Sequence, residues 1–147
     1  MPHAGLIDSE TLGPEAAALL RARLHLRGAR RRFGQGRCAL ALAALYDSLT
    51  SAMDWFLSSP TRRAGASLAA FPPSDDVSTH AALVRTGVLD GSFDFAAFQQ
   101  VVYRALDEDP GASRCAEWLP GAEALLAQLG VLPFDEARLP REDPSAP

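Results

Sequence analysis

The feature that most constrains the fold is a pair of long apolar stripes separated by a short glycine-rich break. Residues 15–33 and 37–58 both carry apolar side chains at alternating spacings of three and four, the repeat of one helix face. Gly34 and Gly36 permit a sharp reversal between them. The pattern predicts an antiparallel helix hairpin with a shallow crossing angle. The stripes consist of Leu19, Ala22, Leu26, Ala29 and Phe33, then Cys38, Leu42, Leu45, Leu49, Ala52 and Phe56.

The second of these helices is predicted to lie at the centre of the molecule. Its opposite face consists of the small residues Ala41, Ala44, Ser48 and Ser51. A helix that is apolar or small nearly all round is normally buried. Only two acidic residues, Asp47 and Asp54, interrupt this pattern.

The remainder of the chain predicts shorter helices joined by turns. A third helix is expected over residues 76–86, a fourth after Asp94 as N-cap, and a fifth over 116–129. The stretch 61–73 is predicted to be a connection. The fold class is therefore all-α, a four- to five-helix up-and-down bundle around the hairpin. Residues 1–132 form its single domain, and the proline-rich tail 133–147 is expected to be poorly ordered.

Composition supports this class and leaves one question open. A chain of 147 residues is long enough for one domain with a core. All fourteen basic residues are arginine, which reflects either coding bias or selection for planar, bidentate contacts. The net charge of −4 is uneven: residues 1–63 carry nine arginines and five acids, whereas 64–147 carry five arginines and thirteen acids. Opposite charge in the two halves favours contact with a second copy.

Several function classes are disfavoured by what the sequence contains. No apolar run approaches bilayer-spanning length, and the N-terminus has no secretory signal pattern, so a cytoplasmic protein with no membrane partner is expected. In that reducing compartment Cys38 and Cys115 are predicted to be ordinary core residues. With no CxxC motif and no Cys/His cluster, neither a metal site nor a cofactor is predicted.

Arginines crowd the first long helix and form one candidate binding surface, represented by Arg27, Arg30 and Arg31. A basic helix can bind a nucleic-acid backbone. Interleaved aromatic residues are missing, however, and the isoelectric point of about 5.3 is acidic. The sequence therefore favours a solvated helix face, partly paired with Asp47, Asp54 or the acidic second half of the chain, over a nucleic-acid site.

A second candidate site is polar and lies between helices. It comprises Tyr46, Asp47, Asp54 and His80. Asp47 and Asp54 are two helical turns apart, roughly 10 Å by the helical rise, so they would bracket a ligand rather than share a proton. His3, His25 and His80 are too scattered to assemble a nucleophile, a base and an orienting group, so no catalytic residue is predicted.

One segment carries a family resemblance. The run Gly34-Gln35-Gly36-Arg37-Cys38-Ala39-Leu40-Ala41-Leu42-Ala43-Ala44-Leu45-Tyr46-Asp47 follows an Ala/Arg/Leu-rich helix and resembles the central hairpin of HEPN-type helical domains over about residues 15–60. The resemblance implies a four- or five-helix bundle, frequently dimeric, associated with nucleotide or RNA transactions. Many members are RNases that use an Arg, four to six intervening residues and then a His. Only three residues separate Arg21 from His25, and no Arg precedes His80 at the required distance, so nuclease activity is not implied.

Three hypotheses about function follow. The leading one is a non-enzymatic helical interaction module that forms a homodimer. The second is a nucleotide- or RNA-binding protein that uses the arginine-rich first helix. The third is a small-molecule sensor or enzyme with a site between helices near Tyr46, Asp47 and His80.

Overall fold

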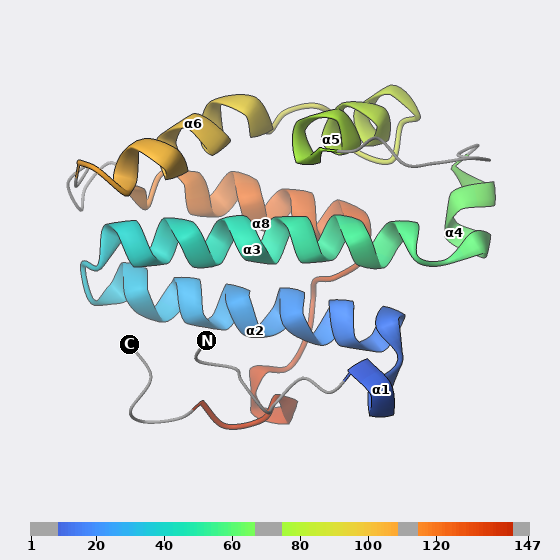
Figure 1. Cartoon of the computed structure of the whole chain (residues 1–147), viewed down its shortest axis with the longest axis horizontal. Helices are drawn as coiled ribbons and strands as arrows, with labels where there is room; N and C mark the ends of the chain where they lie inside the picture. Colours follow the sequence, from blue (N-terminus) through green and yellow to red (C-terminus); the bar gives the residue numbers. More distant parts are fainter. Residues whose placement is uncertain (1–8, 67–74, 109–114, 143–147) are drawn as a thin grey trace.

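The computed structural model describes residues 9–66, 75–108 and 115–142, and in these ranges the chain is helical with no strand (Figure 1). The predicted all-α class is confirmed. Helices α2 (Pro14–Gly34) and α3 (Cys38–Leu57) form the predicted antiparallel hairpin. The observed ends lie within one residue of the predicted ones, because Pro14 starts the first helix and the glycine-rich break ends it.

The turn of the hairpin depends on backbone geometry that glycine allows. Gly36 has a φ of 71°, in the left-handed region, and Arg37 N donates to Arg32 O at 2.9 Å to close the turn. Along the hairpin the two helices meet through small side chains. Ser48 Oγ donates a buried hydrogen bond to Ala22 O at 2.7 Å, which requires a close approach of the two backbones. The predicted small-residue face of α3 is therefore buried.

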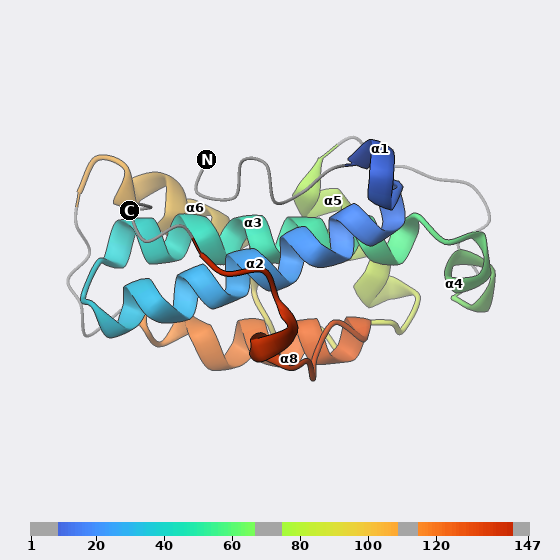
Figure 2. The same cartoon turned by 90° about the horizontal axis from the view of Figure 1, so that it is seen from below.

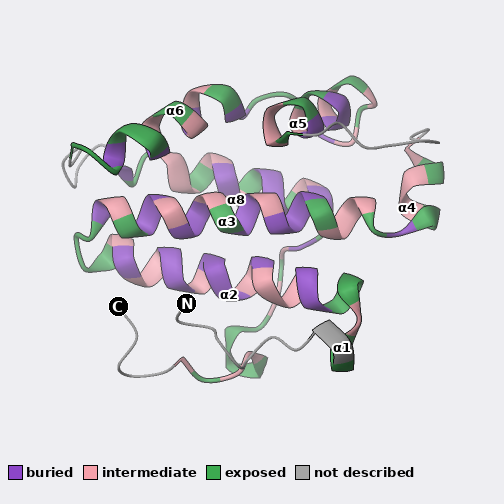
Figure 3. Cartoon of the chain, viewed as in Figure 1, coloured by how far each residue is buried: buried purple, intermediate pink, exposed green. Residues whose placement is uncertain are grey.

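Helix α3 is central, as predicted. Helix α2 covers one side of it, α5 and α6 cover a second, and α8 a third (Figures 1 and 2). Buried residues recur along it from Cys38 to Met53 (Figure 3). The remaining described helices are α1 (Ser9–Leu12), α4 (Pro60–Gly65), α5 (Asp76–Arg85), α6 (Phe95–Ala105), α8 (Trp118–Leu129) and the 3₁₀ turn η1 (Glu136–Arg138).

The predicted third, fourth and fifth helices match α5, α6 and α8, and their caps explain their ends. Asp94 accepts a hydrogen bond from Ala97 N at 3.0 Å, as expected of an N-cap. Gly130 ends α8 in the left-handed conformation at φ 92°. Helix α4 lies in the stretch predicted to be only a connection. The local sequence does indicate where α4 starts, because the Ser59 side chain accepts a hydrogen bond from Arg62 N as N-cap and Pro60 occupies the first turn.

Aromatic side chains fill the space between α3, α6 and α8. Phe98 is fully buried and its ring lies 5.2 Å from Trp118 and 5.4 Å from Phe93, measured between centroids. The geometries are tilted or edge-on, which aromatic pairs prefer. The contact between Phe98 and Trp118 therefore packs α6 directly against α8.

The two cysteines are not the ordinary unpaired core residues that the sequence predicted. Cys38 and Cys115 are both buried, and a disulfide joins them with their Cα atoms 5.9 Å apart. The bond links the first residue of α3 to the chain just before α8. A sequence separation of 77 residues hides this proximity, which only the packing of α8 beside α3 creates.

The C-terminal segment also differs from its prediction as a poorly ordered tail from residue 133. Residues 131–142, which we name the strap, cross from the end of α8 and lie along the outer face of α2 (Figures 1 and 2). Arginines of α2 hold this segment by hydrogen bonds and ion pairs. The proline content suggested disorder, but the contacts with α2 are long-range and are not visible in local sequence.

Candidate functional site

The predicted polar site centres on Tyr46, where α3, α5 and α6 meet. The Tyr46 hydroxyl donates to Asp76 Oδ2 at 2.8 Å and accepts from Gln99 Nε2 at 2.9 Å. Burial raises the pKa of Tyr46; the Gln99 hydrogen bond opposes that rise and the Asp76 carboxylate adds to it. Tyr46 is therefore a neutral donor that ties three helices together. Asp76 and Gln99 were missed from the sequence because nothing local indicates that they reach Tyr46.

His80 lies on the other side of a phenylalanine from this cluster. Its ring stacks on Phe95 at 5.3 Å between centroids, and Tyr46 approaches the same phenylalanine at 5.6 Å. Burial lowers the pKa of His80. A shallow hollow of about 440 Å³ adjoins His80, and Tyr46, Asp47 and Asp54 are not among its lining residues. Of the four predicted residues, only His80 therefore lines this hollow.

Asp47 and Asp54 both lie exposed on the outer face of α3. Desolvation raises the pKa of each carboxyl group. For Asp54 the neighbouring Asp76 carboxylate adds to the rise and Arg21 opposes it. Of the two, Asp54 is therefore the one whose charge is coupled to both α2 and α5.

On the arginine face of α2, defined by the predicted residues Arg27, Arg30 and Arg31, two of the three arginines have acidic partners. Arg30 reaches Glu123 of α8 at 2.7 Å and Glu136 of the strap at 2.8 Å. Arg31 pairs with Glu142 of the strap at 3.4 Å. The predicted arginines do share one surface, but the chain itself occupies that surface.

Arg27 stands out on this face. Its Nε and Nη2 atoms are buried and have no hydrogen-bond partner in the described part of the chain. Oε1 of Glu142 is in the same condition. Buried polar groups are normally satisfied, and each one left unsatisfied costs about 1–3 kcal/mol. The contact between α2 and the strap is therefore imperfectly paired.

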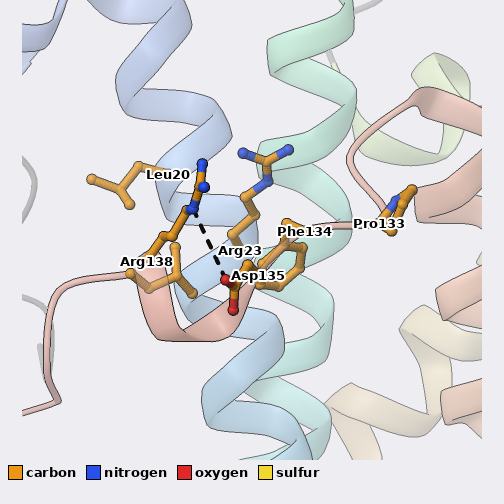
Figure 4. A pocket seen from close by; sticks show the side chains of 7 residues that line it. Leu20, Arg23, Pro133, Phe134, Asp135 and Arg138 are labelled. Carbon is orange, nitrogen blue, oxygen red and sulfur yellow. Dashed lines mark ion pairs between the residues drawn. The ribbon is translucent and has the colours of Figure 1, made fainter.

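A pocket of about 490 Å³ lies where the strap leaves α8 (Figure 4). Arg23 donates from Nη2 to Val131 O at 3.2 Å, and its guanidinium lies 5.3 Å from the centre of the Phe134 ring. Asp135 and Arg138 face each other at its rim, 3.9 Å apart. Arg23 thus anchors the start of the strap rather than presenting itself to solvent.

A third surface lies at the end of the molecule where α3 begins and α6 ends (Figure 1). Its exposed apolar side chains, which we name the end patch, are Leu40, Tyr103 and Leu106, at 44%, 51% and 73% exposure. Because α6 runs antiparallel to α3 and Gln99 meets Tyr46, the last turn of α6 and the first turn of α3 lie at the same end of the bundle. Exposed charges of both signs lie on the same two chain segments: Arg37, Arg104, Asp107 and Glu108.

Other kinds of site find no support. Within residues 9–66, 75–108 and 115–142, no three His, Cys, Asp or Glu side chains are grouped so as to hold a metal ion. None of the helices described there has the length and apolar character needed to cross a membrane. Comparison with models of known families, with curated proteins and with solved structures finds no significant match. The resemblance to HEPN-type domains therefore stays a prediction.

Proposed function

We propose that this protein is a non-enzymatic helical interaction module that forms a homodimer through the end patch. The observation that supports this is the exposure of Leu106, Tyr103 and Leu40 at one end of the bundle. Large exposed apolar side chains that gather in one place mark interaction sites, whereas scattered ones need no explanation.

The charges around the end patch suit a second copy of the same chain. A two-fold contact brings each patch against itself, so it needs both signs of charge on one surface. Arg37 and Arg104 lie on this surface together with Asp107 and Glu108, and none of the four is in an ion pair in the part of the chain that the structure describes. In a two-fold contact, arginines of one copy can face the acidic pair of the other.

The test is the oligomeric state of a charge-insertion variant. Leu106→Glu buries a carboxylate in the proposed contact, so it should weaken association at least tenfold, measured by sedimentation equilibrium up to about 100 µM protein. Leu12→Glu is the matched control, because Leu12 is also exposed but lies on α1 at the opposite end. A monomeric wild type, or equal effects of the two variants, would refute the homodimer.

A second candidate function, binding of a nucleic-acid backbone, is favoured by the unpartnered Arg27 atoms. Phosphate oxygens would supply the acceptors that the guanidinium lacks. The triple change Arg27→Ala, Arg30→Ala and Arg31→Ala should reduce the salt dependence of RNA binding. The same charge loss at Arg63, Arg85 and Arg104, which lie on α4, α5 and α6 rather than on α2, is the control. Equal losses in the two triple variants would count against a site on α2.

A further inference from the structure

We infer that the strap is a built-in competitor that occupies the arginine face of α2 and gives way to the phosphodiester backbone of single-stranded RNA. This inference rests on the second candidate function and adds its regulation. The contacts that carry it are those of the strap's acidic side chains with α2, together with the polar atoms that those contacts leave unsatisfied.

The strap places carboxylates where phosphates would bind. Glu136 meets the Arg30 guanidinium at 2.8 Å, and Glu142 meets Arg31 at 3.4 Å. The two strap carboxylates follow the helix, one against each arginine. Charge-assisted bonds to planar guanidinium groups are the contacts that arginine also makes with phosphate. The strap therefore acts as an internal acidic ligand of this face.

The strap leaves some polar atoms at the arginine face without hydrogen-bond partners among the described residues. Arg27 lies between Arg23, which holds the start of the strap, and Arg31, which holds its end, yet two of its nitrogens are buried with no partner among the described residues. One oxygen of Glu142 is also unsatisfied. A ligand with acceptor oxygens at every step along the helix would pair with Arg27 as well, which gives it an advantage over the strap.

The strap is also held by contacts that a polyanion can displace. The side chains of Arg30 and Glu136 keep 33% and 44% of their surface exposed. Ion pairs with this exposure are weak and are screened by salt. By contrast, the Glu123 contact to Arg30 comes from α8 and does not depend on the strap, so it can keep Arg30 oriented when the strap leaves.

The length of the face selects an extended ligand over a single phosphate. Arg23 and Arg31 are eight residues apart on α2, about 12 Å along the axis by the helical rise. One inorganic phosphate cannot span that distance, whereas consecutive phosphates of a nucleic-acid strand can. The occupant already present, the strap, likewise contacts α2 at several points between Arg23 and Arg31.

The experiment neutralises the strap without changing its shape. Full-length Glu136→Gln/Glu142→Gln is compared with Asp47→Asn/Glu117→Gln, which makes the same change in net charge at two exposed acids outside the strap. Binding of a fluorescent single-stranded RNA is followed by anisotropy at several salt concentrations. The strap variant should bind about fivefold more tightly than the control, the scale of two surface ion pairs. Adding Arg27→Ala to the strap variant should cancel the gain.

The possible outcomes distinguish two claims: that the strap competes with RNA, and that the arginine face binds RNA. Equal affinity of the strap and control variants, with RNA bound by both, would overturn competition while leaving the face as a binding site. Absence of RNA binding in every variant would overturn both proposals. If millimolar inorganic phosphate displaced the fluorescent RNA as well as unlabelled RNA does, this would contradict the proposal that the face selects an extended ligand. Increased amide exchange in residues 134–142 of the wild type on adding RNA would support displacement of the strap.

Discussion

At the scale of single residues, His25 is a titratable group buried in the first long helix. It lies in α2 with only 4% of its surface exposed. Burial lowers its pKa to about 4, and the positive charges of Arg21 and Arg32 act in the same direction. His25 is therefore neutral in the folded protein at neutral pH, and its protonation opposes folding.

This predicts a loss of stability on mild acidification. Between pH 6.5 and pH 4 the unfolded chain binds a proton at His25 that the folded chain does not, so the free energy of unfolding falls as pH falls through this window. The loss approaches about 3 kcal/mol near pH 4. Urea unfolding at a series of pH values measures it. His25→Gln should flatten the slope, and His80→Gln, at a less buried position, should flatten it less. An unchanged slope in His25→Gln would assign the pH dependence to other groups.

At the scale of elements, Arg62 joins three helices at the end opposite the end patch. From α4 it donates to Phe56 O of α3 at 3.1 Å and pairs with Glu15 of α2 at 2.7 Å. Its guanidinium also lies over the Trp55 ring, 3.9 Å from the centroid. Together with Arg63, which donates to Leu57 O of α3 at 2.7 Å, Arg62 holds the unpredicted helix α4 against the hairpin.

Substitution of Arg62 tests that role. Arg62→Ala should lower the free energy of unfolding by about 1–2 kcal/mol, because it removes a cation–π contact and charge-assisted hydrogen bonds. Arg62→Lys should recover less than half of the loss, since an ammonium group cannot stack and donate as a fork at once. Arg85→Ala, at an exposed arginine of α5, is the control and should change stability little. Full rescue by lysine would show that only charge matters there. Chemical denaturation provides the measurement.

At the scale of the whole molecule, the Cys38–Cys115 disulfide restricts the conformations that the unfolded chain can adopt. It closes a loop of 77 residues that contains α3, α4, α5 and α6. Disulfides persist in oxidising compartments, whereas thiols stay reduced in most cytosolic proteins. The cytoplasmic location predicted from the sequence remains a prediction, and the disulfide is a reason to test it.

Breaking the disulfide should destabilise the fold. Cys115→Ser, or a reductant added to the wild type, is expected to lower the free energy of unfolding by about 2–5 kcal/mol, because the unfolded chain regains the freedom that a long closed loop removes. Thermal unfolding with and without reductant measures the effect, and Cys115→Ser should no longer respond to reductant. Two reactive thiols in the denatured, unreduced protein would contradict the bond.

The sequence by itself determined the elements. Apolar spacing located α2 and α3, Asp94 and Gly130 located ends of α6 and α8, and the small residues of α3 indicated its central position. These properties are local, since each depends on residues within a few turns of one helix. The choice of Arg27, Arg30 and Arg31 as a binding surface stays a prediction, since helical periodicity says only that these three residues are neighbours on α2.

Only the tertiary structure decided what those surfaces contact. The disulfide, the strap on α2 and the link from Tyr46 to Asp76 and Gln99 join residues separated by 30 to 111 positions. No local pattern specifies such pairs, because they depend on how α5, α6, α8 and the strap are placed around α3 once the apolar surface is buried. For the same reason the sequence predicted that the basic face of α2 is partly paired with the acidic second half of the chain, but not that Glu123, Glu136 and Glu142 are the residues that reach it.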